Sequence, residues 1–448
     1  MNKEYELIDQ LFDELFPITR SITGEGVRKT ISILKKYIPL EMFSVKTGTK
    51  VFDWEIPKEW VIREAWIKDE EGNEIVNMKN HNLHVLNYSI PVNKKMSLEE
   101  LKPFIHTIPH LPEAIPYVTS YYKERWGFCM SYNQFKSLKQ GIYHVFIDSE
   151  LKNGELNYAH AILPGKSDKE ILISTYICHP SMANNELSGP LVAAFLYNRL
   201  KKWKERNFTY RFVFVPETIG SIAYLHRFGE HLRKHVYSGF VLTCLGGKNY
   251  PLSFKRSRNK NAPINKIVDY LMSTGEMDIV VRPFTPINGS DERQYCSPGF
   301  NLPIGQFARM VYGQYDGYHN SLDTKEVMTI EKIVDSIDEI ERILKIQEWN
   351  GYYVNVNPFG EVKLDKHGLY PDMNTPLNRD ASTNFKRDQR KQLNVILTLL
   401  NYSDGEHSLL DIAEISGYCF HDFVDMIQLL KRKGLLEGPY YEKRSLSV

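Results

Sequence analysis

The amino-acid sequence predicts an α/β protein whose mixed, mostly parallel sheet is covered by helices on both faces. The first observation is the run EILISTYI at residues 170–177, which is apolar and β-branched with almost no charge. Such a run is typical of a central parallel strand buried on both faces. The second is that strands and helices alternate after it, as crossover connections require. The third is that the pattern of apolar and polar residues differs before and after this region, which predicts two smaller units.

Composition and charge place the chain among globular proteins. Its 448 residues are 42% hydrophobic and 12% aromatic, enough for two or three domains with large cores. Lys and Arg number 56 against 55 for Asp and Glu, so no overall field draws the chain to nucleic acid or acidic lipid. No apolar run approaches the ~18 residues of a membrane span, and the five scattered cysteines form no CxxC pair. We therefore expect a cytoplasmic protein with reduced thiols and no membrane association.

The N-terminal segment, residues 1–50, is expected to be the first part of the main, catalytic domain. Apolar residues at helical spacing predict a helix over residues 4–16, which Pro17 ends. The loop ITRSITGEG comes next and leads into a second amphipathic helix. The polar residues of this loop are Arg20, Ser21, Thr23 and Glu25. They either cap the second helix or face a substrate, and the pattern favours the cap.

Residues 51–125 have the texture of a separate β-rich domain inserted into the main one. Apolar and polar residues alternate, and the tripeptide EGN at residues 71–73 predicts a turn between antiparallel strands. The proline-rich stretch IPHLPEAIPYVTSYY ends this domain and predicts the return of the chain to the main one. His81 and His84 have no acidic or cysteine partner at metal-binding spacing, so we interpret them as satisfied or surface histidines.

The second part of the main domain is expected over residues 126–352, where strands and helices alternate. This order predicts a mixed, mostly parallel sheet with helices on both faces. The predicted strands lie at residues 143–149, 157–163, 170–177, 210–215, 239–245, 278–283 and 302–307, and the predicted helices at 188–205, 221–235, 263–273 and 330–349.

Polar residues gather where two predicted strands end. His179 and Glu186 come after the strand at 170–177, and Glu217 comes after the strand at 210–215. Open α/β sheets bind ligands at the carboxyl ends of their strands, so these residues define a candidate site. Taken alone, the position of Glu217 favours a cap of the helix that starts after it over a role on a substrate, because a carboxylate stabilises a helix N-terminus.

Two later loops add further candidates. NGSDERQY contains Asp291 and Arg293, although charged residues in a loop are usually solvated. YGQYDGYHNSLDT places His319 among aromatic residues, ahead of an Asp-Thr pair that predicts a cap for the segment after it. Two histidines with acids at successive strand ends are typical of a metal-dependent hydrolase.

The motifs at these strand ends resemble those of a known family. ANNELSG at residues 183–189, PETIG and YHNSLDT are similar to the motifs of co-catalytic zinc exopeptidases of the aminopeptidase and glutamate-carboxypeptidase type. More closely, the whole chain resembles a bacterial aminopeptidase-like family that carries FPITRSITGEGVRKT, an inserted domain, CHPSMANNELSG and a C-terminal winged helix. The resemblance implies a phosphorylase/hydrolase-like three-layer αβα sandwich, a zinc-dependent hydrolase and an association with polysaccharide biosynthesis.

Three positions depart from the exopeptidase pattern. Asn185 stands where the family has a metal-bridging Asp, and Thr218 stands where a second Glu comes after the first. VLTCLGG offers Thr243 where a later acidic ligand is expected. Amide and hydroxyl groups are poor zinc ligands beside carboxylate or imidazole. The sequence therefore predicts one zinc ion per chain in place of two.

The predicted site combines this one ion with one base. Zinc would be bound by His179, His319 and Glu186, a set of two imidazoles and one carboxylate. Glu217 would take the proton from a water that attacks an amide carbonyl, and return it to the leaving amine. Asp291 would be the carboxylate ligand if Glu186 points away. The substrate-binding candidates are Asn185, Asp291 and Arg293.

The tail is expected to hold a linker at residues 353–378 and a winged-helix domain at 379–448. LLDIAEISGYCFHDFVDMIQLLKRKGLL has the helix-turn-helix arrangement, with Gly417 at the turn. The helix in the DNA-reading position, residues 419–431, carries Asp422 and Asp425 and has its basic residues only at its end. This pattern favours a protein partner or self-association over DNA binding.

Two functions of different classes remain open from the sequence. The leading one is a zinc-dependent aminopeptidase-like hydrolase that cleaves a terminal amide bond in a small peptide or an aminoacyl or N-acyl substrate. The alternative is an inactive exopeptidase fold that binds a ligand and regulates or scaffolds through its winged helix. The missing acids favour the alternative, whereas His179, Glu217 and His319 favour the hydrolase.

Overall fold

The computed structural model describes residues 3–370 and 383–444, which divide into two compact units. The first unit takes the chain up to Val268 together with Gly275–Glu341. The second takes Asp269–Thr274 and the chain from Arg342 onward. In the part of the chain so described, no helix combines the length and apolar character needed to cross a membrane.

The core of the first unit is an eight-stranded mixed sheet in the order β1-β10-β12-β11-β13-β16-β14-β15. Strand β11 lies between β12 and β13 and is parallel to both, and every one of its residues is buried, as the sequence predicts. The strands are β1 (Glu41–Lys46), β10 (Glu155–Leu163), β11 (Glu170–Tyr176), β12 (Thr209–Val215), β13 (Val236–Leu242), β14 (Leu252–Lys255), β15 (Ile279–Arg282) and β16 (Ile304–Ala308).

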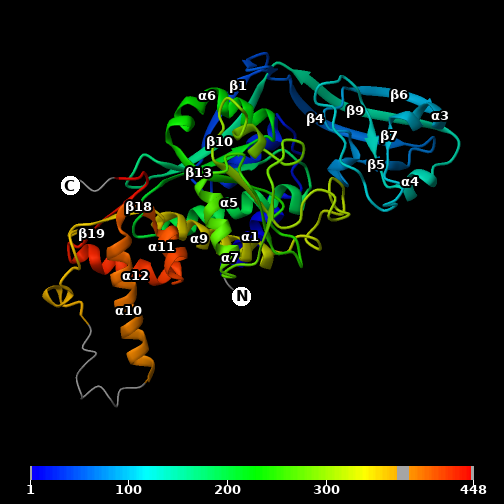
Figure 1. Ribbon diagram of the computed structural model, residues 1–448. Helices are drawn as coiled ribbons and strands as arrows, with labels where there is room; N and C mark the ends of the chain where they lie inside the picture. Colours follow the sequence, from blue (N-terminus) through cyan, green and yellow to red (C-terminus); the bar gives the residue numbers. More distant parts are fainter. Residues whose placement is uncertain (1–2, 371–382, 445–448) are drawn as a thin grey trace. The chain divides into compact units, whose positions relative to one another are not determined.

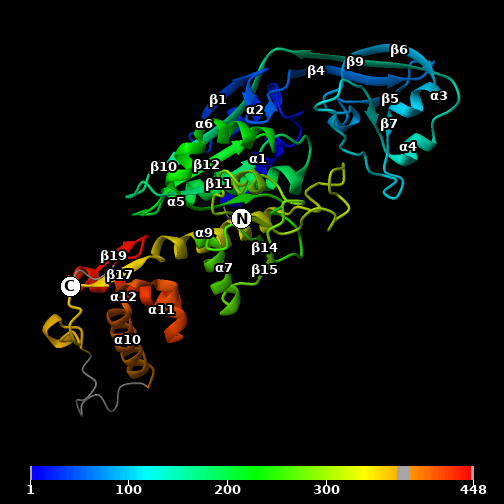
Figure 2. The ribbon, with the colours of Figure 1, turned by 45° about the horizontal axis from the view of Figure 1, so that its top comes forward.

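Helices cover this sheet on both faces, which gives the predicted three-layer αβα sandwich. Helix α5 (Ser188–Lys201) connects β11 to β12, and α6 (Ile219–His235) connects β12 back across to β13. The two crossovers run in opposite directions, so right-handed connections place α5 and α6 on opposite faces, as Figures 1 and 2 show. The other helices of the first unit are α1 (Lys3–Leu15), α2 (Glu25–Leu34) and α8 (Glu292–Tyr295). Helices α7 (Pro263–Ser273) and α9 (Ile330–Trp349) each begin in the first unit and end in the second.

A second, four-stranded sheet in the order β5-β4-β9-β6 forms the inserted domain. The antiparallel hairpin of β4 and β5 turns at the predicted place, with Gly72 at φ 85°. Its strands are β4 (Glu59–Lys68), β5 (Glu74–Asn77), β6 (Val92–Ser97) and β9 (Ile142–Lys152). The shorter elements around it are β2 (Lys50–Val51), β3 (Trp54–Glu55), β7 (Ile105–His106), β8 (Phe128–Cys129), α3 (Leu98–Leu101) and α4 (Tyr132–Lys136).

The assignment of the strand at 143–149 to the main sheet is wrong. Strand β9 pairs antiparallel with β4 and β6 over its whole length, and exposed and buried residues alternate along it. This period of two is typical of a sheet with one solvated face, not of the buried parallel sheet. The chain therefore returns to the main sheet at the turn between β9 and β10, later than the proline-rich stretch suggests.

The histidines of the inserted domain have the satisfied contacts that the sequence predicts. His84 Nδ1 lies 2.8 Å from the carbonyl oxygen of Cys129, and His81 Nδ1 accepts the backbone N–H of Leu83 at 3.2 Å. Burial lowers the pKa of both imidazoles, that of His81 to about 4. They are neutral structural residues at physiological pH.

The second unit contains the predicted winged helix. Strand β17 (Tyr352–Asn355) pairs with β18 (Asp404–Ser408) on one side and β19 (Leu436–Tyr440) on the other (Figures 1 and 2). The helices of this unit are α10 (Thr383–Tyr402), α11 (Leu409–Ser416) and α12 (Phe420–Arg432). Gly417 ends α11 at φ 70°, which a residue without Cβ adopts freely. Strand β17 falls inside the predicted linker, so the linker begins after it, and residues 371–382 at the predicted boundary lie outside the described residues.

Candidate active site

The candidate site lies where the order of the main sheet reverses. From β11 the chain moves through α5 to β12 on one side, and from β12 it moves through α6 to β13 on the other. Open α/β sheets bind ligands at such a switch point, at the carboxyl ends of the strands. Cys178 and His179 come shortly after β11 ends at Tyr176, and Glu217 comes shortly after β12 ends at Val215.

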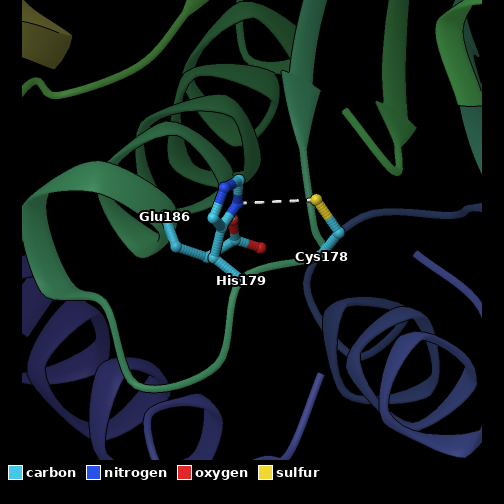
Figure 3. A group of neighbouring side chains, drawn as sticks. All are labelled: Cys178, His179 and Glu186. Carbon is cyan, nitrogen blue, oxygen red and sulfur yellow. Dashed lines mark hydrogen bonds and ion pairs between the residues drawn. The ribbon is translucent and has the colours of Figure 1, made fainter. Parts of the chain in front are cut away.

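His179 has an acidic neighbour on each ring nitrogen. Its Nδ1 lies 2.8 Å from Glu186 Oε2 and 3.4 Å from the Cys178 sulfur (Figure 3). Its Nε2 lies 3.7 Å from Glu217 Oε2. Burial opposes a charge on the imidazole, but Cys178, Tyr117 and Glu186 together raise the pKa of His179 well above its ordinary value. An ionised carboxylate only accepts hydrogen bonds, so Nδ1 carries a proton toward Glu186.

Glu186 is held from behind by a buried arginine of the N-terminal loop. Arg20 Nε donates to the carbonyl oxygen of His179 at 2.8 Å and lies 3.7 Å from Glu186 Oε1. Helix α2 has Gly24 at its N-cap with no side-chain cap bond, so the capping role expected for this loop is not observed. The alternative, a loop that reaches the site, is the better description, because Arg20 is fully buried beneath His179.

A single π-helical turn, Ala183–Leu187, carries Glu186 and is tied to the loop of His319. Asp323 accepts the backbone N–H groups of Asn184 at 2.8 Å and Asn185 at 2.9 Å. It therefore caps this distant turn, whereas the sequence suggests a cap of the residues after it. Burial raises the pKa of Asp323 to about 7. The Asn185 side chain donates to the Tyr176 hydroxyl at 3.0 Å, and its Oδ1 is buried with no hydrogen-bond partner among the described residues.

Glu217 and Asp291 have the opposite roles to those that their positions suggest. Asp291 is buried and caps α6, because its Oδ1 accepts the Thr218 N–H at 2.7 Å and the Ser221 hydroxyl at 2.8 Å. Glu217 points into the site, where its Oε1 accepts the Ser290 hydroxyl at 2.7 Å. Burial and the charge of Glu217 raise the pKa of Asp291 to about 8. Burial also raises the pKa of Glu217, although 27% of its side chain stays exposed and water can reach it.

Arg293 is half-buried on the short helix α8, beside Glu217. Its Nε donates to the carbonyl oxygen of Ser290 at 3.2 Å, and its positive charge acts to lower the pKa of Glu217, against the larger effect of burial. Part of the Arg293 side chain faces solvent. The guanidinium is therefore placed to meet an anionic group of a ligand near Glu217.

His319 comes close to His179 with an aromatic ring beside both. The centroids of the two imidazoles are 5.3 Å apart, and the ring of Tyr117 lies 5.3 Å from His179 and 5.5 Å from His319. Burial, with the charge of His179, lowers the pKa of His319 to about 3, so this imidazole is neutral and one of its ring nitrogens carries a lone pair. Tyr117 belongs to the stretch 114–121, whose sequence gives no sign of a site residue.

Residues with strained backbone lie in the loops at the same strand ends. Eight described residues other than glycine have positive φ, and four of them, Ser181, Thr218, Cys244 and His319, lie in the loops at these strand ends. Left-handed backbone is unusual for any residue with a Cβ and an outlier for a β-branched one such as Thr218 at φ 64°. Strain of this kind persists where the surroundings enforce it, and it is concentrated at functional sites.

Of the three predicted metal ligands, His179 and Glu186 have ligand atoms close together, whereas His319 only has its ring beside that of His179. Ligand atoms of Cys178, His179 and Glu186 all lie within 4.8 Å of one another. His319 does not belong to that group, although its ring neighbours that of His179. Glu186 uses Oε2 on His179 Nδ1, and the Nε2 of the same ring faces Glu217. His179 thus has His319 and Glu217 beside it, and the three residues come from three different strand ends.

Fold and site together define an aminopeptidase-like α/β domain joined to a winged helix. The chain belongs to the family described as a domain of unknown function (DUF4910), whose model matches residues 9–350. Residues 351–438 match a family described as winged helix-turn-helix.

Individual relatives agree with this assignment. A Clostridium acetobutylicum protein named "Putative polysaccharide biosynthesis protein with aminopeptidase-like domain" is 44% identical over 96% of each chain. A crystal structure of a "putative peptidase" from the same organism has 42% identity and a TM-score of 0.86, covering 97% of this chain and 96% of that one. The zinc aminopeptidase BSAP of Bacillus subtilis has 13% identity and a TM-score of 0.56, covering 76% of this chain and 93% of its own, and so shares the fold.

Proposed function

We propose that this protein is a hydrolase of terminal amide bonds, an aminopeptidase or a deacylase, that uses one zinc ion. The observation that carries the proposal is the approach of His179 Nε2 and Glu217 Oε2 to 3.7 Å beside the neutral imidazole of His319. Hydrolytic zinc sites combine imidazole ligands on the metal with a carboxylate base beside it, and His179, His319 and Glu217 come from three different strand ends. The zinc aminopeptidase fold supports the same reaction class.

The residues present fit a zinc ion at His179 and His319. A histidine that binds a metal usually donates its other ring N–H to a carboxylate, which fixes the ring and raises the basicity of the ligand nitrogen. Glu186 stands in this position toward His179 Nδ1, so we propose that it orients His179 and is not itself a ligand. Thr243 bonds the Tyr176 hydroxyl at 2.6 Å and supplies no carboxylate, which supports one ion in place of two.

Glu217 is the proposed general base. Burial raises the pKa of Glu217 toward the working pH, where a general base is most efficient. The exposed part of its side chain lets water reach it. The Ser290 hydroxyl fixes one oxygen and leaves the other toward His179. Glu217 would take the proton of the attacking water and return it to the leaving amine. A zinc ion bound nearby would supply Lewis acidity toward the amide carbonyl.

Substrate contacts are assigned to the remaining polar groups. Arg293, half-exposed and close to Glu217, would bind a carboxylate or phosphate of the substrate. Asn185 Oδ1 is a buried acceptor with no partner among the described residues, which suits a substrate N–H. Asp291 is committed to capping α6, so its contribution to substrate binding would be indirect.

The test is a metal titration combined with one conservative variant. Protein stripped with a chelator and reloaded should bind one zinc ion per chain and hydrolyse members of a panel of aminoacyl anilides and N-acyl amino sugars. Glu217→Gln should keep the ion and lose turnover by roughly 100-fold or more, because an amide cannot accept the proton. Glu230→Gln, at an exposed glutamate of α6, is the matched control and should change neither quantity.

Several results would contradict this proposal. Two ions per chain in elemental analysis would refute the single site, and loss of the ion in Glu217→Gln would make Glu217 a ligand. A chain that never binds zinc would favour the alternative of an inactive ligand-binding protein. One arrangement supports that alternative as well: His179 lies between the carboxylates of Glu186 and Glu217, at 2.8 and 3.7 Å, as in a structural ion-pair network.

A further inference from the structure

A cavity of about 820 Å³ lies between the inserted domain and the edge of the main sheet. Its walls come from residues 46–48 after β1, from residues 55–58 and 120–124 of the inserted domain, and from the turn between β9 and β10. Ligand-binding pockets have volumes of roughly 300–1,000 Å³, so the cavity is large enough for one or two sugar rings or a short peptide.

The cavity is separated from the candidate active site by two tyrosines. Tyr121 lines the cavity, and its hydroxyl lies 2.5 Å from that of Tyr117. Tyr117 in turn packs against the imidazoles of His179 and His319. The side chains of Tyr121 and Tyr117 thus lie between the cavity and the imidazole of His179.

The lining combines aromatic rings with balanced charge. Tyr88, Tyr121 and Tyr122 line the cavity, and Tyr122, with 57% of its surface exposed, has the exposed ring of Trp54 5.7 Å away. Exposed aromatic rings that gather beside a cavity mark a binding surface. The ionisable lining residues are Lys46, Lys58, Lys123, Glu55, Glu124 and Glu155.

The chemistry of this lining selects a class of ligand. Equal numbers of lysine and glutamate give no net field, which disfavours polyphosphate or nucleic acid. Aromatic faces bury apolar surface, and the flanking charged groups both donate and accept hydrogen bonds. A pyranose ring offers the matching features, an apolar C–H face and a rim of hydroxyl groups.

We propose that the cavity is a sugar-binding subsite next to the site of His179 and Glu217, from which the Tyr117–Tyr121 pair divides it. This inference rests on the proposed function in one respect, because it adds an amino sugar to the substrate class expected near that site. Binding in the cavity requires no chemistry, and it is therefore measurable separately from turnover.

The test is calorimetric or NMR-detected binding of the disaccharide N,N′-diacetylchitobiose to the zinc-loaded protein, with trialanine as the peptide probe. The disaccharide should bind, and Tyr122→Ala should weaken its binding roughly fivefold to tenfold through loss of the stacking ring. Tyr122→Phe keeps the ring and should bind like the wild type. Phe359→Ala, at an aromatic residue 83% exposed in the second unit, is the matched control and should have no effect.

The outcomes separate this inference from the proposed function. Disaccharide binding retained in Glu217→Gln, with turnover lost, supports both. Disaccharide binding in a protein that hydrolyses no amide of the panel refutes the hydrolase and leaves the sugar subsite standing. Turnover without any disaccharide binding, binding unchanged in Tyr122→Ala, or trialanine bound in its place with the same Tyr122 dependence overturns the sugar subsite.

Discussion

At the scale of single residues, the site depends on which atom each carboxylate contacts. Glu186 meets Nδ1 of His179 and Glu217 approaches Nε2, so the two acids address opposite edges of one ring. The carboxylate that faces Nδ1 fixes the proton there and leaves Nε2 for a metal or a proton. Arg20 then holds Glu186 in place from the protein interior. In the proposed mechanism, the glutamate at Nδ1 therefore orients His179 and the glutamate near Nε2 transfers the proton.

Glu186→Gln should weaken zinc binding without abolishing it. Loss of the carboxylate lowers the basicity of His179 and frees its ring, and such changes typically reduce metal affinity about 10–100-fold. Competition titration against a chromogenic chelator measures the change, with Glu230→Gln as the exposed control. Complete loss of the ion would make Glu186 a direct ligand, and unchanged affinity would exclude it from the metal site.

Asp291 should make the stability of the metal-free protein depend on pH. Its folded pKa of about 8 is raised above the ordinary value, so the folded state keeps a proton that the unfolded chain releases above about pH 4. The free energy of unfolding should therefore fall as pH rises toward 8, by up to about 1.4 kcal/mol per pH unit from this group.

Asp291→Asn mimics the protonated acid and should reduce this slope. Urea unfolding at about pH 5 and pH 8 measures it, and Asp53→Asn, at an exposed residue, serves as the control. An identical slope in Asp291→Asn and in the wild type would show that Asp291 is ionised in the folded protein.

At the scale of elements, the sequence predicts those helices and strands whose bounds follow from a local pattern of apolar residues. Helix α9 appears with the predicted bounds, because its amphipathic repeat is continuous from Ile330 to Trp349. Strand β9 is assigned to the wrong sheet, because its partners β4 and β6 are chosen by long-range pairing. That His179 and Glu217 are neighbours could be predicted because both come shortly after buried parallel strands. Tyr117 is missed because its contacts with both histidines come from distant parts of the chain.

The pairing of β11 with β12 contains a buried ion pair whose loss should be costly. Glu170 accepts two hydrogen bonds from Arg211, at 2.6 and 2.8 Å. Burial opposes the charge of Glu170, but its contacts with Arg211 and His231 outweigh burial and lower its pKa. Glu170→Gln leaves the Arg211 charge buried with a weaker partner and should reduce the free energy of unfolding by about 3 kcal/mol.

An exposed ion pair of the inserted sheet provides the control for this change. Glu150→Gln breaks the contact of Glu150 with Arg63, in which half of each side chain is solvated, and should cost less than about 1 kcal/mol. Both values come from urea unfolding. Equal costs for the two variants would show that burial does not strengthen the Glu170–Arg211 pair.

At the scale of the whole molecule, the winged helix forms most of the second unit, and its charges bear on whether it binds DNA. Helix α12, in the position that reads DNA in such domains, carries Asp425 and an Asp422 that pairs with Lys391 at 2.7 Å. Its basic residues, Lys431 and Arg432, come only in the last turn. Phosphate contacts supply most of the affinity of DNA-binding domains, and this helix offers few of them.

We therefore expect no mobility shift of duplex DNA by the full chain at physiological salt. Titration of a random-sequence duplex and a genomic fragment pool, beside a basic winged-helix protein as positive control, measures it. A sequence-specific shift that weakens steeply with added salt would contradict the expectation, because that dependence reports released counterions.

The stretch from the inserted domain that carries Tyr117 is also stitched to the loop of His319. The backbone N–H of Tyr117 donates to the His319 carbonyl at 2.8 Å, that of Ser321 donates to Ile115 at 2.9 Å, and Pro116 forms a bridge with Asn320. Residues 115–117 of the inserted segment and residues 319–321 are thus joined by backbone hydrogen bonds. An inserted domain grafted from a relative would keep these bonds only if residues 317–323 were exchanged together with it.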